Sequence, residues 1–171
     1  MRQALYLLYP FPYRTLIDSA AAGAGLDPRL LAAVIRTESG FRSDAASRKQ
    51  ALGLMQIEPS TGAWIAGKTG DDPDFAVLDL LNPAINVRMG AWYLSELRRQ
   101  MNGRMLPAVA AYNAGPENVA RWLASGGWSG HAADADRIPF GETRVFVERV
   151  LSSYRMYRLL YPDPTAPASG L

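Results

Sequence analysis

The chain has 171 residues, of which 49% are hydrophobic and 20% charged, a composition that fits one globular domain with a sizeable core. Its formal net charge of +2 is too balanced for a nucleic-acid-binding surface, so we expect no nucleic acid as a partner. The chain has no cysteine and one histidine, His131, which excludes disulfides, thiolate metal sites, cysteine nucleophiles and most histidine-based catalytic sites.

The N-terminal stretch does not have the features of a membrane span or a signal peptide. It carries one arginine and a short apolar run that Pro10 and Pro12 interrupt, and it has no small-residue cleavage site. No later stretch contains the roughly 18 apolar residues that a membrane span requires. If the protein works outside the cytoplasm, we expect either secretion by another route or an export segment or membrane anchor that lies outside this chain.

Apolar residues at helical spacing, between proline starts and glycine ends, predict that the rest of the chain is mainly α. We predict helices over 28–39, 59–66, 83–102, 106–112, 116–123 and 142–160. Loops are expected over 68–75 and 125–141, and the second is long enough to line a site. We expect the tail, 162–171, to be disordered and residues 1–171 to form a single domain with at most a minor β element.

Glu38 is the first candidate catalytic residue. It follows Val34 and Ile35 by four and three residues, which places it on the apolar face of the first predicted helix, at the C-terminal end. Burial and the negative end of the helix dipole would both raise its pKa, as a general acid requires. On spacing alone, the commoner interpretation is a glutamate at a frayed helix end that points to water or pairs with Arg36 or Arg42.

The segment ALGLMQIEPST places the neutral amide of Gln56 among the apolar residues Leu54, Met55 and Ile57. Such an amide could bind sugar hydroxyl and acetamido groups while the apolar neighbours pack against the sugar faces. Taken alone, the segment is more simply interpreted as an ordinary turn with an apolar strip in the core.

The segment AAYNAG places Tyr112 and Asn113 at a predicted helix end. A hydroxyl and an amide there could bind a polar ligand. For Asn113 by itself, capping of the helix C-terminus is the simpler interpretation.

Together these segments resemble the soluble lytic transglycosylase family, glycoside hydrolase family 23, which is related to goose-type lysozyme. The resemblance rests on four segments in order: LLAAVIRTESGF, ALGLMQIEPST, AAYNAGPENVARWL and IPFGETRVFVERVL. It extends from about Tyr9 to Tyr161, and the opening LYPFPYRTLI is similar to short members in which a membrane segment precedes the catalytic domain. The resemblance implies a lysozyme-like helical domain with a substrate cleft.

The resemblance also implies a role for individual residues. Glu38 would be the acid and base, with Ser39 as its neighbour in the Glu-Ser motif, and Tyr112 would lie near the catalytic carboxyl. The substrate-binding positions would be Ser47, Leu54, Met55, Gln56, Tyr112, Asn113 and Glu142. Two residues depart from the family pattern, because Phe146 stands where tyrosine is frequent and Glu58 where an apolar residue is common.

The implied activity is cleavage of the β-1,4 bond between N-acetylmuramic acid and N-acetylglucosamine in peptidoglycan, with formation of 1,6-anhydromuramyl ends. The implied partner is the glycan strand, and the implied location is the cell envelope, outside the cytoplasm. No cofactor is expected, and the acidic segment DDPD lacks the pattern of a calcium loop. The alternatives are a goose-type muramidase that hydrolyses the same bond, a wall-binding module without turnover, and a helical interaction domain.

Overall fold

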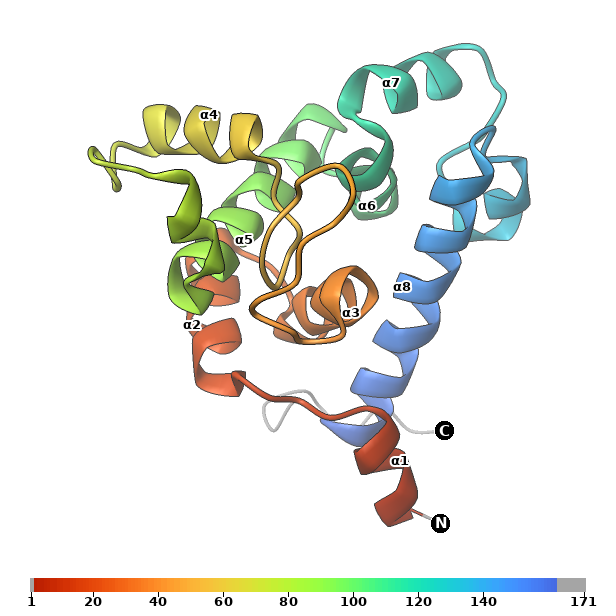
Figure 1. Cartoon of the computed structure of the whole chain (residues 1–171). Coiled ribbons are helices and arrows are strands. Elements are labelled where there is room, and N and C mark those ends of the chain that lie inside the picture. The colour runs from red at the N-terminus through yellow and green to blue at the C-terminus, as the bar shows by residue number, and fades with distance from the viewer. Residues whose placement is uncertain (1, 163–171) are drawn as a thin grey trace.

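The computed structural model describes residues 2–162 and is mainly α, as predicted (Figure 1). Within these residues there is no named strand, and the only β pairing consists of the isolated bridges Ala46–Leu52 and Leu52–Ile57. The α-helices are α1 (Arg2–Leu8), α2 (Arg14–Ala24), α3 (Pro28–Ser39), α4 (Pro59–Thr69), α5 (Pro83–Gln100), α6 (Met105–Ala114), α7 (Pro116–Ala124) and α8 (Gly141–Leu160). Two short 3-10 helices are η1 (Val77–Leu81) and η2 (Ala132–Arg137).

Local capping explains where the two helices that frame the site begin. The Asp27 carboxylate accepts a hydrogen bond from the Arg29 backbone N–H at 2.9 Å, and Pro28 occupies the first position of α3. Asn82 caps α5 in the same way, accepting from Ala84 N–H at 2.9 Å, with proline again in the first turn. These starts confirm the predicted ones.

Helix α3 lies at the centre of the fold. Leu30 to Ile35 are all buried, so this helix is apolar on every side over most of its length. It packs against α8 along one side and against α2 on another, while α5 and α6 complete the core (Figure 1). Of α3, only the first residues, Pro28 and Arg29, and the polar C-terminal turn that carries Glu38 are partly exposed.

The segment between α3 and α4, residues 40–58, folds over the C-terminal end of α3 (Figure 1). It is closed by backbone hydrogen bonds from Ser47 N–H to the Ala51 carbonyl, at 2.9 Å, and between Leu52 and Ile57, both at 3.0 Å. We call residues 40–58 the site loop, because its inner side forms one wall of the pocket described below.

Several elements differ from the prediction. Helix α4 continues to Thr69, where Gly70 ends it in the left-handed conformation, so it is longer than predicted. Helices α1 and α2 and the two 3-10 helices were not predicted; in α2 the buried residues are only Ile17 and Ala21, and small alanines give little hydrophobic pattern. Except for Pro162, the predicted disordered tail falls outside the described residues. Among the residues described, no helix is both long and apolar enough to cross a membrane.

Candidate active site

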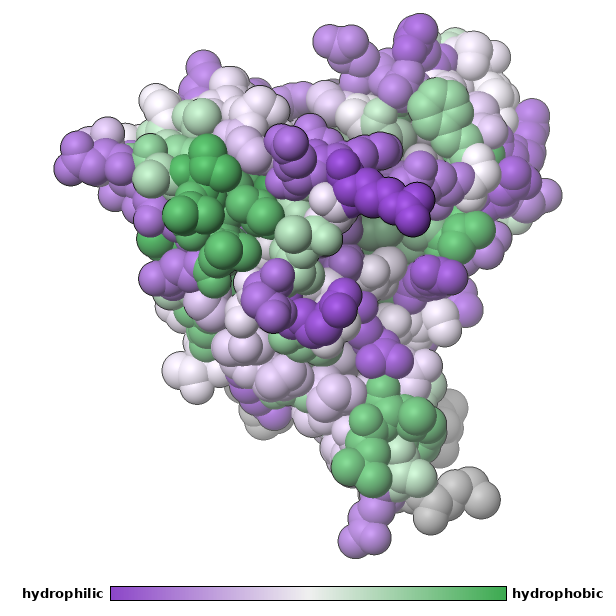
Figure 2. Space-filling view, viewed as in Figure 1, coloured by the Kyte–Doolittle hydropathy of each residue, from purple (hydrophilic) through white to green (hydrophobic). Residues whose placement is uncertain are grey.

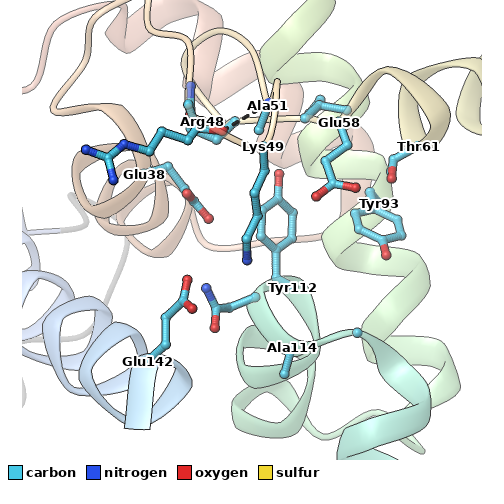
Figure 3. A pocket seen from close by; sticks show the side chains of 15 residues that line it. Glu38, Arg48, Lys49, Ala51, Glu58, Thr61, Tyr93, Tyr112, Ala114 and Glu142 are labelled. Atoms are coloured by element: carbon cyan, nitrogen blue, oxygen red, sulfur yellow. Dashed lines mark hydrogen bonds between the residues drawn. The ribbon is translucent and has the colours of Figure 1, made fainter. Parts of the chain in front are cut away.

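A pocket of about 540 Å³ lies where the site loop meets α3, α5, α6 and α8 (Figure 3). Six of the predicted site residues line it, although they come from segments up to 104 positions apart in the sequence. These residues are Glu38, Ser47, Gln56, Tyr112, Asn113 and Glu142. None of the residues of the predicted loop 125–141 lines this pocket, because that segment packs on itself and on α7 around the buried Trp128.

Glu38 occupies the last turn of α3 and is partly exposed to the pocket. Burial, followed by the negative charge of Glu142, raises the pKa of its carboxyl to about 8. The second cause expected from the sequence was the helix dipole; in the structure it is a second carboxylate from α8. At neutral pH Glu38 therefore holds a proton that it can donate.

The alternative in which an arginine neutralises Glu38 is wrong. The Arg36 guanidinium lies over the Tyr9 ring, 4.5 Å from its centroid, on another side of α3. The Arg42 Nε atom donates to the Ser39 carbonyl at 3.2 Å. Within the described residues, no basic side chain forms an ion pair with Glu38.

Ser39 attaches the end of α3 to the site loop. It is buried, and its hydroxyl donates to the Leu54 carbonyl at 2.8 Å. The residue next to Glu38 is thus bonded to the opposite wall of the pocket, which limits how far the carboxyl can move relative to that wall.

The prediction that Leu54 and Met55 line the cleft is wrong. Both side chains have 0% exposure, because they point away from the pocket into the core. A side chain on Gly90 of α5 would collide with Met55, so the absence of a Cβ there allows the loop to approach the helix closely. The apolar residues of this strip position the loop and do not contact a ligand.

Asn86, on the buried face of α5, holds this part of the loop in place and was missed in the sequence. Its Oδ1 accepts from Met55 N–H at 2.7 Å, and its Nδ2 donates to the carbonyls of Leu52 at 2.9 Å and Leu80 at 2.8 Å. The side chain is completely buried and all its hydrogen-bonding groups are used. The signal was available, since an asparagine within an apolar helix face requires partners.

Gln56 lines the pocket from a strained position in the loop. Its backbone has a left-handed φ of 49°, and its side-chain amide nitrogen donates to the carbonyls of Gly53 at 2.9 Å and Ala45 at 3.1 Å. Because the nitrogen is used within the loop, the amide oxygen is the atom left to accept a hydrogen bond from a ligand.

Tyr112, at the end of α6, crosses the floor of the pocket (Figure 3). Its hydroxyl donates to the Met55 carbonyl at 2.8 Å. Burial, followed by the nearby Glu38 and Tyr93, raises the pKa of this phenol well above its ordinary value. The phenol therefore stays neutral, and its oxygen can only accept a further hydrogen bond from a ligand.

Asn113 is oriented by α8. Its Oδ1 accepts from the Thr143 hydroxyl at 2.7 Å, so its amide nitrogen is the group that remains for the pocket. The interpretation of Asn113 as a helix cap is wrong, because α6 continues to Ala114 and ends at Gly115. Glu142, in the first turn of α8, lines the same pocket and faces Glu38 across it (Figure 3).

Comparison with known proteins identifies the family. The model of the transglycosylase SLT domain matches residues 15–134. This chain belongs to the transglycosylase SLT domain family. A soluble lytic murein transglycosylase from Salmonella typhimurium is 35% identical over 152 residues, which cover 88% of this chain and 23% of the relative. An endo-type membrane-bound lytic murein transglycosylase A from Klebsiella pneumoniae is 42% identical over 97 residues, covering 56% of this chain and 48% of the relative.

Solved structures show the same lysozyme-like fold. The 70-kDa soluble lytic transglycosylase from Escherichia coli has a TM-score of 0.86 at 31% identity, covering 93% of this chain and 26% of the other. The lytic transglycosylase Slt from Pseudomonas aeruginosa has a TM-score of 0.83 at 37% identity, and the match covers 96% of this chain and 27% of the other. That structure is of an inactive variant in which a glutamate is replaced by glutamine. The chain thus spans about a quarter of the length of the soluble relatives that it matches.

The rim of the pocket in this SLT domain carries charges of both signs, of which the two cations were not predicted. Arg48 and Lys49 project from the tip of the site loop, where the Ser47 hydroxyl accepts a hydrogen bond from Ala51 N–H at 3.1 Å (Figure 3). Glu58, the departure from the family pattern, lies on the opposite side near Tyr93 and helps to raise the pKa of that phenol. The mouth of the pocket is therefore basic on the loop and acidic toward α4.

The geometry of the SLT domain supports proton transfer at a single position. Glu38 lines the pocket, and its pKa is raised to about 8. Around it lie acceptors at Gln56 and Tyr112 and a donor at Asn113, which suit a ligand rich in hydroxyl and amide groups. In the part of the chain that the structure describes, no group of three or more acidic or histidine side chains could hold a metal ion.

Proposed function

We propose that this chain is a lytic transglycosylase domain. It would cleave the β-1,4 bond between N-acetylmuramic acid and N-acetylglucosamine in peptidoglycan and leave 1,6-anhydromuramyl ends. The observation that carries this proposal is the raised pKa of Glu38 in a pocket that also presents the amides of Gln56 and Asn113 and the phenol of Tyr112. The names of the relatives, which are lytic murein transglycosylases, supply the substrate and the reaction type.

In this mechanism Glu38 acts twice. Its carboxyl donates a proton to the oxygen that joins the two sugars, so the bond from this oxygen to C1 of the muramyl unit breaks. The resulting carboxylate then takes the proton of the C6 hydroxyl on the same muramyl unit, and that oxygen bonds to C1. No water is consumed, and a nucleophile within the substrate reacts at a high effective concentration.

The substrate-binding roles follow from the free hydrogen-bonding atoms. The Gln56 and Tyr112 oxygens would accept from sugar hydroxyl or acetamido N–H groups, and the Asn113 nitrogen would donate to a sugar oxygen. Ser47 and Glu142 line the same space and would contact the sugar from opposite sides. Glycan strands are thus the proposed partner, and the cell envelope outside the cytoplasm is the proposed location.

One observation favours a second candidate, a goose-type muramidase that hydrolyses the same bond. Glu58 places another carboxylate in the pocket, where the family commonly has an apolar residue, and such a group could activate water. The products separate the two activities, because hydrolysis leaves reducing muramyl ends and transglycosylation leaves anhydro ends.

The test is product analysis of purified wall digested by the wild type and by Glu38→Gln. Glutamine keeps the size and shape of the side chain but cannot exchange a proton, so release of anhydromuropeptides should fall at least ~100-fold in a folded variant. Mass spectrometry quantifies the products, and circular dichroism checks the fold. If the folded Gln variant releases anhydromuropeptides at nearly the wild-type rate, another group performs the proton transfer and the mechanism is wrong.

A further inference from the structure

A second hollow lies beside the candidate active site, between α4 and α5. It has a volume of about 260 Å³ and shares two of its lining residues, Thr61 and Tyr93, with the catalytic pocket. The two hollows therefore adjoin at Thr61 and Tyr93, which is the arrangement expected of neighbouring sites for one polymer. We call the second hollow the Trp64 groove, after the largest side chain that lines it.

The ring of Trp64 is partly open to solvent but held in place. The side chain is 40% exposed although its neighbour in sequence, Ile65, is completely buried. Its ring lies 5.6 Å from the ring of Trp92 and 6.1 Å from that of Tyr93, measured between centroids. These two contacts fix the orientation of the indole. A ligand that stacks on the indole therefore costs little side-chain conformational entropy at Trp64.

The aromatic contacts continue to the catalytic pocket. The Tyr93 ring lies 5.5 Å from that of Tyr112, which crosses the pocket floor near Glu38. A row of rings thus runs from the exposed Trp64 to the site of proton transfer. Since aromatic faces suit the apolar C–H faces of pyranose rings, this row marks a path for successive sugars of one strand.

The other residues of the groove suit a neutral sugar. The hydroxyls of Ser60 and Thr61 lie on one side, and the amide of Gln100 lies on the other. The Gln100 nitrogen donates to Glu96 at 2.9 Å, which leaves the amide oxygen to accept from a ligand. Every side chain that lines the groove is uncharged, whereas the cations of the active site stand on the site loop.

We propose that the Trp64 groove is an additional binding site for a neutral N-acetylhexosamine unit of the strand whose cleavage occurs at Glu38. This inference rests on the proposed function for its substrate and adds the direction in which the strand leaves the catalytic pocket. Contacts made with a remote sugar favour long strands over short ones, because a short substrate that fills the catalytic pocket does not reach the groove.

The test measures how fast Trp64→Leu cleaves two substrates, long glycan strands and a tetrasaccharide that the wild type cleaves. The leucine variant should lose about 5-fold in kcat/KM on strands, as expected for the loss of one stacked ring, and keep its rate on the tetrasaccharide. Trp64→Phe keeps an aromatic face and should retain most of the wild-type preference for strands. Tyr13→Leu is the matched control, because Tyr13 is 38% exposed and lines neither hollow.

Two kinetic outcomes would overturn the proposal: equal losses on both substrates, or an unchanged rate on strands. A wild type that cleaves neither substrate would refute the proposed function, and the groove would then be judged by binding alone. Binding is measured by NMR titration of Glu38→Gln with the hexasaccharide of N-acetylglucosamine, following the indole N–H signals. The indole N–H signals of Trp64 and Trp92 should shift, whereas the signal of Trp128, which is completely buried, should keep its chemical shift. An unmoved Trp64 signal at saturation would exclude the groove as a sugar site, whatever the variants do.

Discussion

Glu38 keeps its proton near neutral pH for two separable reasons. Burial at the end of α3 reduces the hydration of its carboxylate, and the charge of Glu142 opposes a second negative charge nearby. The first reason belongs to the packing of α3, whereas the second depends on one exposed side chain of α8. A substitution can therefore remove the second without disturbing the first.

Glu142→Gln should lower the pKa of Glu38, because it removes the negative charge that raises it. The alkaline limb of kcat/KM, which reports loss of the Glu38 proton at about pH 8 in the wild type, should then move to lower pH. The measurement is wall cleavage across the neutral to alkaline range. Glu148→Gln makes the same charge change on α8 away from the pocket and should leave the limb in place. An alkaline limb at the same pH in Glu142→Gln and the wild type would show that the two carboxylates are not coupled.

At the scale of elements, the active site depends on how the site loop is seated on α5. Asn86 forms two hydrogen bonds with the loop, at Met55 and Leu52, and a third with the Leu80 carbonyl of η1. Gly53 approaches Asn86 so closely that a Cβ would collide with the Leu80 carbonyl and the Asn86 amide. Gly53 also has a φ of 76°, which side chains other than glycine rarely adopt. The loop is held by main-chain contacts, and its position determines that of Gln56.

Asn86→Leu should destabilise the protein strongly although it preserves the volume of the side chain. It leaves the Met55 N–H and the Leu80 carbonyl buried without partners, at a cost of about 1–3 kcal/mol each. Urea unfolding measures the loss in the free energy of unfolding. Ser95→Ala, which removes one hydrogen bond from α5 to the Ala24 carbonyl, is the control and should cost about 1 kcal/mol. A loss for Asn86→Leu no larger than that of the control would mean that the loop is held by other contacts.

At the scale of the whole molecule, the proposed acid stands at the end of the most deeply buried helix. The charge state of Glu38 is therefore linked to the stability of the entire fold. Its pKa is about 8 in the folded protein and near its ordinary value of 4.5 when the chain is unfolded. Between these values the folded state retains a proton that the unfolded state has lost, so this group's contribution to stability declines as pH rises and is lost above about pH 8.

Glu38→Gln should remove this decline. Its melting temperature should match the wild type below about pH 4.5 and exceed it by a margin that grows until about pH 8. The lowered pKa values of Asp27 and Glu96 affect both proteins alike, so the difference isolates Glu38. Thermal unfolding at a series of pH values measures it. A margin that does not change with pH would mean that Glu38 titrates normally in the folded protein.

The sequence by itself determined the helices and the order of the polar motifs. The starts at Pro28, Pro59, Pro83 and Pro116 were predicted correctly, because capping and proline geometry act within one turn of the chain. The apolar face that carries Glu38 could be predicted for the same reason, since helical periodicity places neighbours a few residues apart. The roles of the individual site residues and the single-domain organisation stay predictions.

Only the tertiary structure decided which side chains meet and which are buried. Leu54 and Met55 are enclosed because Gly90, some 35 positions later, lets the loop approach α5; no pattern within the loop itself shows this. The charge beside Glu38 comes from Glu142. The exposed ring of Trp64 contacts Tyr93, which lines the pocket. Burial and electrostatic proximity depend on distances between segments far apart in the chain, and a single sequence specifies these only through the packing of the complete fold.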